Sequence, residues 1–95
     1  MNADYISRLA RELTDSEPDR NSKMRALVDE LHRRWSGVVD ADDACLFVIA
    51  LAVSVGIRCR FVAARFGPHS WTCFVAYETE DGRWETVDPL RQKVT

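Results

Sequence analysis

Three short stretches of this chain carry the residue types that nucleophilic and acid–base chemistry requires. His69 stands just before an apolar stretch that begins at Trp71, and Asp88 precedes Pro89 near the C-terminus. Upstream, the run Asp-Ala-Asp-Asp-Ala-Cys at 40–45 has the form of a helix start. A histidine can act as a general base when an aspartate fixes its tautomer, and a helix N-terminus can lower the pKa of a thiol. Together these are the components of cysteine-dependent hydrolysis or acyl transfer.

The N-terminal part that must support these residues shows the apolar spacing of two amphipathic helices. The first is expected over about residues 3–14, and a polar loop that contains Pro18 follows it. Asn21 or Ser22 can cap the second helix, and the Ser-Gly pair at 36–37 ends it. The apolar stripe of this second helix consists of Met24, Leu27, Val28, Leu31 and Trp35.

A third helix is predicted to begin at Asp40, which is a good N-cap residue. Asp43 stands three residues later, at the spacing of a capping box. From 44 to 55 nearly every residue is small or apolar, so we expect this helix to be buried on several sides. Gly56 is the expected residue just past its end.

Three strands are predicted after the third helix. Residues 57–63 alternate between apolar and polar or small side chains, which predicts a strand with one face in the core. A turn at 66–68 leads to residues 71–77, which are apolar on both faces and therefore indicate a central strand. A hairpin turn at 80–82 precedes a third strand at 84–87. Three helices followed by an antiparallel meander predict an α+β domain in which the apolar third helix packs on the sheet.

The order of these features resembles the transglutaminase-like superfamily, in which Cys, His and Asp follow each other on a helix start and two strands. The helix-start motif of that family usually reads Gly-Asp-Cys-x-Asp, and residues 39–43 here read Val-Asp-Ala-Asp-Asp. Ala41 therefore stands where the family has its nucleophilic cysteine. The family pattern His-x-Trp matches at His69, and its Trp-x-x-x-Asp-Pro ending matches at Asp88. One departure is Cys73, which stands where the family often has an acidic residue.

The resemblance covers about residues 38–90, and the small members of the superfamily include bacterial and phage proteins, many with unassigned substrates. It implies a papain-like α+β core within one domain, with residues 1–37 as an added helical part. His69 would be the general base and Asp88 would fix its tautomer, because the two are expected on neighbouring strands of one hairpin. The implied reaction passes through a thioester on a peptide or protein substrate and needs no cofactor.

Ala41 has no atom that can attack a substrate, so we expect the chain as written to be inert in thiol-dependent hydrolysis. Cys45 lies one helical turn deeper, roughly 6 Å along the axis, among apolar neighbours, and is interpreted as a core residue. Three explanations of Ala41 remain open. The natural protein has a cysteine here and the chain carries an inactivating change; or it is a natural pseudoenzyme that binds a peptide or protein through the old cleft; or the match is accidental and the chain is a small structural or interaction domain.

Other charged pairs have simpler interpretations. Asp42 and Asp43 point in different directions on a helix, so they are expected to complement its dipole and do not form a catalytic pair. Arg58 and Arg60 face the same side of one strand and are predicted to be solvated or to pair with acidic residues.

The whole composition narrows the class of protein. Its 95 residues predict one small domain, and a formal charge of −2 gives no indication of a nucleic-acid partner. No apolar run is long enough for a membrane span, and the N-terminus does not read as a signal peptide. All three cysteines lie inside apolar segments, which indicates reduced, buried thiols in a cytoplasmic protein, and no cysteine or histidine spacing indicates a metal site. Because its surface loops are short, such a domain can work within a larger assembly.

Overall fold

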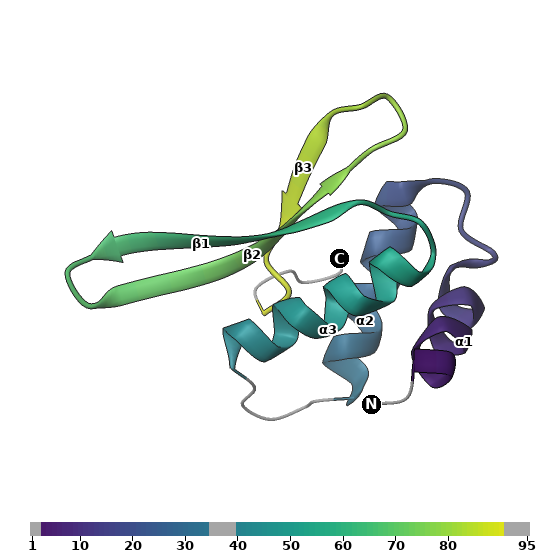
Figure 1. Ribbon diagram of the computed structural model, residues 1–95, viewed down its shortest axis with the longest axis horizontal. Helices are drawn as coiled ribbons and strands as arrows, with labels where there is room; N and C mark the ends of the chain where they lie inside the picture. The colour runs from purple at the N-terminus through teal and green to yellow at the C-terminus, as the bar shows by residue number, and fades with distance from the viewer. Residues whose placement is uncertain (1–2, 35–39, 91–95) are drawn as a thin grey trace.

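Three helices precede a three-stranded antiparallel sheet, which is the α+β class that the sequence predicts (Figure 1). The computed structural model describes residues 3–34 and 40–90; the predicted core residue Trp35 and the predicted helix end at 36–37 lie outside these ranges. The elements are α1 (Ala3–Thr14), α2 (Arg20–Arg34), α3 (Ala41–Ser54), β1 (Cys59–Gly67), β2 (Ser70–Glu78) and β3 (Trp84–Val87).

α3 is the central helix, because it contacts α1 and α2 as well as β1 and β2 (Figure 1). Its inward residues Ala44, Val48 and Leu51 are fully buried, since they follow each other at helical spacing on one face. Leu46 and Val53, by contrast, are each more than half exposed. The prediction of burial on several sides is therefore wrong for the face that carries these two residues. The rest of the core includes Ile6, Ala10, Met24, Leu27, Val28, Leu31, Val75, Tyr77 and Val87.

The N-terminus of α2 is capped by Asp19, which corrects the prediction of Asn21 or Ser22. The backbone N–H of Ser22 donates to Oδ1 of Asp19 at 2.8 Å, and this satisfies one of the unpaired N–H groups of the first turn. Asn21 serves a different purpose, because its Oδ1 accepts a hydrogen bond from the Tyr77 hydroxyl at 2.7 Å. That bond ties the start of α2 to the central strand.

Both ends of α3 lie where the sequence predicts them. Asp40 occupies the N-cap position with an extended backbone (φ −65°, ψ 143°), but its side chain makes no capping hydrogen bond. The predicted capping box with Asp43 is therefore not formed. At the other end Gly56 has a φ of +83°, and its N–H donates to the carbonyl of Val53 at 3.0 Å. This left-handed residue closes the helix, a conformation in which glycine is favoured.

The sheet has the order β1-β2-β3, so β2 is the central strand, as predicted. β1 and β2 pair from Cys59 opposite Tyr77 outward to a two-residue turn at 68–69, which replaces the predicted turn at 66–68. β2 and β3 pair over four positions that end with Val75 opposite Val87.

The ladder between β2 and β3 ends because of Pro89. The N–H of Thr79 donates to the carbonyl of Arg83 at 2.8 Å. Because hydrogen-bonded pairs alternate along an antiparallel ladder, the odd-numbered residues of β3 are the ones that bond to β2. The next such position after Val87 is Pro89, and proline has no N–H to donate. Its carbonyl instead accepts a hydrogen bond from Nε2 of His32 in α2.

The outer half of the β1–β2 hairpin extends past the helices (Figure 1). Phe61 and Trp71 are 43% and 64% exposed, although the alternation of the sequence predicts that both face the core. The alternation correctly identifies their shared face, but the helices do not reach far enough to cover it. No helix within residues 3–34 and 40–90 combines the length and apolar character needed to cross a bilayer.

Candidate functional site

The N-terminus of α3 lies against β2 through one side-chain hydrogen bond. Ala41 is the first residue of the helix and packs against the edge of the core. Asp42 follows it, and its Oδ1 accepts a hydrogen bond from the Cys73 thiol at 3.0 Å. The helix tip, where the resemblance places a nucleophile, therefore contacts the central strand at Cys73.

Asp88 belongs to the same neighbourhood. It follows β3, its Oδ1 accepts the backbone N–H of Leu90 at 3.1 Å, and its negative charge helps to raise the pKa of the Cys45 and Cys73 thiols. The structure thus brings the end of β3, the first turn of α3 and the middle of β2 together. Two of the three predicted site positions, Ala41 and Asp88, lie in this region.

His69 does not lie there. The sequence predicts His69 on a strand next to that of Asp88. In the structure it occupies the exposed turn between β1 and β2. Since Val87 pairs with Val75, Asp88 comes level with Phe74, which is five residues along β2 from His69. At a strand rise of about 3.3 Å per residue the separation is roughly 17 Å, beyond any hydrogen bond. The predicted contact between the histidine ring and Asp88 is therefore not made.

None of the three thiols is activated. Burial raises the pKa of Cys45 to about 12, with smaller contributions from Cys73, Asp88 and Asp42. Burial also raises the pKa of Cys59 to about 11. The hydrogen bond to Asp42 raises the pKa of Cys73, because the carboxylate stabilises the protonated thiol. All three are free thiols that stay protonated at neutral pH, with Cys45 and Cys73 buried and Cys59 half-buried.

The contact between Asp42 and Cys73 is the feature of this region that the sequence analysis missed. Alternation along residues 71–77 indicates that Cys73 faces the helices. Which helical residue it meets depends on how far α3 is shifted along the strand, and no local sequence signal gives that shift. Chemically the contact holds the helix on the sheet, and it supplies neither a nucleophile nor a base.

One cavity beside the sheet lies away from the predicted site residues. A cavity of about 280 Å³ is lined by Asn21, Met24, Arg25, Tyr77, Glu85, Thr86 and Val87. Its walls come from α2, β2 and β3, and none of the predicted site residues lines it. This cavity therefore gives no support to a cleft at the tip of α3.

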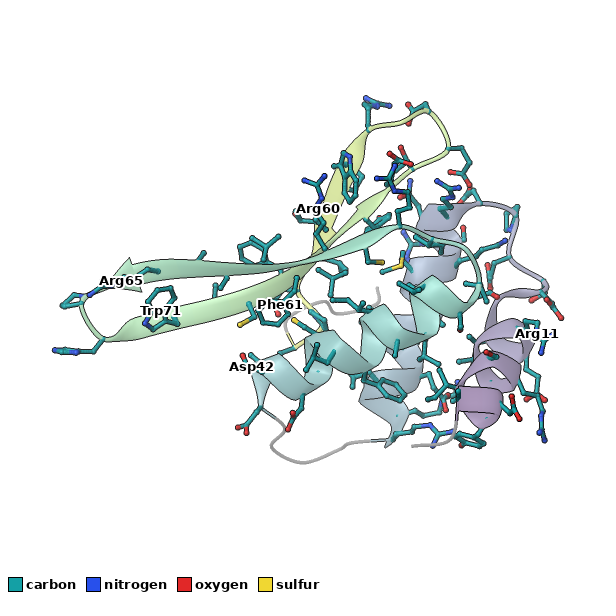
Figure 2. All side chains as sticks on the ribbon, viewed as in Figure 1. Arg11, Asp42, Arg60, Phe61, Arg65 and Trp71 are labelled. Atoms are coloured by element: carbon teal, nitrogen blue, oxygen red, sulfur yellow. The ribbon has the colours of Figure 1, made fainter. Side chains whose placement is uncertain are left out.

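The projecting hairpin carries aromatic and arginine side chains in contact (Figure 2). The Arg65 guanidinium lies 5.6 Å from the ring centre of Trp71 and donates to the carbonyls of Gly67 and Pro68 at 2.9 Å each. On the opposite face of the sheet, Arg60 lies 4.5 Å from the ring centre of Trp84. Cation–π contacts of this kind hold the guanidinium groups in place while leaving them at the surface.

Part of the predicted solvated face is confirmed by an ion pair. Arg58 lies 3.5 Å from a carboxylate oxygen of Glu78, which agrees with the expected pairing of Arg58 with an acidic residue. The same guanidinium lies 5.9 Å from the ring centre of Trp84.

No family model, no curated protein and no solved structure matches this chain. The resemblance to the transglutaminase-like superfamily therefore stays a prediction from residues 38–90.

Proposed function

We propose that this chain is a protein-binding module without hydrolytic activity of its own, and that the β1–β2 hairpin is its contact surface. The observation that carries the proposal is Trp71, which is 64% exposed on a hairpin that extends past the helices. Tryptophan and arginine are the residues in which binding energy concentrates at protein interfaces. Phe61 and Arg65 lie on the same face of the hairpin as Trp71, since Arg65 pairs with Trp71 and strand residues two positions apart share a face.

The local chemistry supports binding over catalysis. A cysteine hydrolase needs a thiolate, a base within hydrogen-bond reach and a group that orients the base. Ala41 supplies no thiol, His69 lies in the hairpin turn, and the pKa of each native thiol is raised. The first two requirements are therefore not met by the described side chains.

A second candidate is a transglutaminase-like hydrolase that has lost its nucleophile at position 41. Two observations favour it. α3 begins at Ala41, so the position has the helix N-terminus that activates thiols, and Asp88 lies near enough to affect the pKa of Cys45 and Cys73. Both candidates are compatible with binding of a peptide, and they differ in whether a thiol at position 41 is activated.

A selection of random peptides against the immobilised chain tests the proposed function. Selected peptides are measured by fluorescence anisotropy against the wild type, Trp71→Ala and Tyr5→Ala. Tyr5 is a matched control, because it is an exposed aromatic residue on α1 that is 43% exposed. We expect Trp71→Ala to weaken binding by about tenfold, as for an interface anchor, and Tyr5→Ala to leave it unchanged. Failure to select any peptide, or equal affinity for Trp71→Ala, would show that the hairpin is not a binding surface.

A further inference from the structure

We propose that the partner is an acidic, extended segment that adds as a strand along the outer edge of β1. This inference rests on the proposed function and names the chemistry of the partner and its mode of binding. It is carried by two separate observations on the described residues: no strand pairs with the outer edge of β1, and no carboxylate lies at ion-pair distance from Arg60 or Arg65.

The outer edge of β1 offers backbone groups at alternate residues. The carbonyl of Arg58 accepts the N–H of Glu78 at 3.0 Å, so Arg58 and Glu78 form a hydrogen-bonded pair. Because antiparallel pairing alternates, the even-numbered residues of β1 bond to β2 and the odd-numbered residues point their N–H and C=O groups away from it. Phe61, Ala63 and Arg65 therefore present their backbone groups outward. Within the described residues no strand pairs with this edge (Figure 1).

An edge of this kind is a template for another strand. β1 has nine residues, whereas protected edge strands are usually short or carry lysine or proline in their interior. Its middle, at 61–64, holds only uncharged residues. Main-chain hydrogen bonds to an added strand supply affinity, and side chains at alternate positions supply specificity.

The charge of the hairpin indicates an acidic partner. Residues 57–77 hold three arginines and no carboxylate, so the segment carries +3 in a chain whose net charge is −2, and the remainder carries −5. Arg58 is paired with Glu78, but no carboxylate within the described part of the chain lies at ion-pair distance from Arg60 or Arg65. These two guanidinium groups lie against aromatic rings instead.

The same charge argues against a second copy of this chain as the occupant. Pairing of two β1 edges would place Arg60 and Arg65 of each copy along one seam, and like charges on adjacent strands are destabilising. An acidic strand added at the same backbone positions would place carboxylates beside these arginines, so the charges would attract.

The positions of the two arginines define a probe. Arg60 and Arg65 are five residues apart and therefore point to opposite faces of the sheet. An added strand needs carboxylates with the same spacing, as in an acetylated and amidated peptide of sequence Glu-Thr-Val-Thr-Val-Glu. One control peptide has Gln in place of both Glu residues. A second control, Glu-Thr-Val-Thr-Glu-Val, has the same composition with the carboxylates four apart, so that both lie on one face.

The experiment measures anisotropy of the labelled peptides with four chains: wild type, Ala63→Pro, Ala63→Thr and Arg60→Gln. Ala63→Pro removes an outward N–H that makes no bond within the hairpin, whereas Ala63→Thr keeps it and suits a strand. Circular dichroism shows whether each variant is folded. We expect the Gln peptide to bind about fivefold more weakly than the probe, as for the loss of two exposed ion pairs, and the respaced peptide about twofold more weakly, because it keeps one of them. Ala63→Pro should lose about tenfold in affinity and Ala63→Thr none.

Arg60→Gln provides a second test if Ala63→Pro fails to fold. It removes one of the two arginines, so the free-energy difference between binding of the Glu peptide and binding of the Gln peptide should fall to about half. Selected peptides that bind through Trp71 but tolerate Ala63→Pro would overturn strand addition and leave the proposed function standing. Equal binding of the Glu and Gln peptides would overturn the acidic partner. A dimer in light scattering that Ala63→Pro abolishes would identify a second copy as the occupant and overturn the proposal.

Discussion

Introduction of a thiol at the tip of α3 separates the binding module from the inactivated hydrolase. The substitution is Ala41→Cys, and the structure predicts an ordinary thiol. An unperturbed cysteine has a pKa of about 8.5, and a helix N-terminus lowers it by about 0.2 to 0.7 of a unit. The carboxylates of Asp42 and Asp43 oppose that effect, because a nearby negative charge disfavours a thiolate. His69 contributes nothing, because it lies four residues along β2 from Cys73, the strand residue that Asp42 contacts, and this is roughly 13 Å.

These numbers give a rate that can be measured. At pH 7 a thiol with a pKa of 8.5 is about 3% ionised, whereas a thiol paired with an imidazole is almost fully ionised, which is about 30-fold more thiolate. We therefore expect the thiol at position 41 to react with iodoacetamide within a few-fold of free cysteine. It should still react faster than Cys45, whose pKa is raised to about 12 by burial. The double variant with His69→Ala should react within twofold of the single variant.

The assay follows alkylation of each cysteine by mass spectrometry of proteolytic fragments, with the native thiols as internal references. A thiol at position 41 that reacts about 30-fold faster than free cysteine, and that loses this advantage in the His69→Ala background, would refute the placement of His69 in an isolated turn. It would also favour the hydrolase over the binding module. Circular dichroism of both variants is the control for folding.

Three further predictions concern the groups around this region. Burial raises the pKa of Cys45 to about 12 in the folded state, while an unperturbed thiol has a pKa of about 8.5, so stability that is present below about pH 8.5 is lost as the pH rises toward 12. The contribution of Cys45 to this loss is about 2 kcal/mol at pH 10, and guanidinium unfolding at pH 7 and pH 10 should show a smaller loss in Cys45→Ala. Asp42→Ala should accelerate alkylation of Cys73 at pH 8 and cost about 1 kcal/mol more in urea unfolding than Asp43→Ala, because both variants lose a carboxylate at the helix N-terminus but only Asp42→Ala loses the bond to Cys73. Gly56→Ala should cost about 1 kcal/mol, because a φ of +83° is strained for alanine, and an unchanged melting temperature would contradict the left-handed cap.

The elements of this fold are predictable from the sequence where local signals act alone. The bounds of α1, the start of α3 at Ala41, the closing Gly56 and the four-residue β3 all follow from spacing, capping and turn residues. Each of these depends on residues that are close together in the chain. Asp19 is the exception, because several polar residues in one loop can cap and only the geometry selects one.

The pairing of distant strand positions is less predictable, and the candidate site depends on it. His69 and Asp88 are expected on neighbouring strands of one hairpin with a turn at 80–82. The observed pairs are centred on residue 81, with Val75 opposite Val87, which sets Asp88 level with Phe74 and leaves His69 in the other turn. In hairpins the register follows from the turn, and the turn at 80–82 is predicted correctly. His69 lies 12 residues before its centre and Asp88 only seven after it, so the hairpin does not bring the two side by side.

The sequence also predicts more burial on the β1–β2 hairpin than the structure shows. Apolar alternation identifies which side chains share a face, and Phe61 and Trp71 do share one. It does not indicate how far a neighbouring layer extends, and the helices end before the tip of the hairpin (Figure 1). The residues that the sequence assigns to the core are for this reason the ones that form the proposed contact surface.

The hydrogen bond between His32 and the carbonyl of Pro89 has a consequence for the order of folding. Among the described elements the backbone of β3 pairs only with β2, and just past β3 this bond joins the chain to α2 across 57 residues. Contacts of such long sequence separation form late, because the loop entropy must be lost first. We expect β3 to join a preformed helical body last and to open first, so its amides should exchange with deuterium sooner than those of α3. Asp88, one residue beyond β3, then reaches its place beside Cys45 only in the final step of folding.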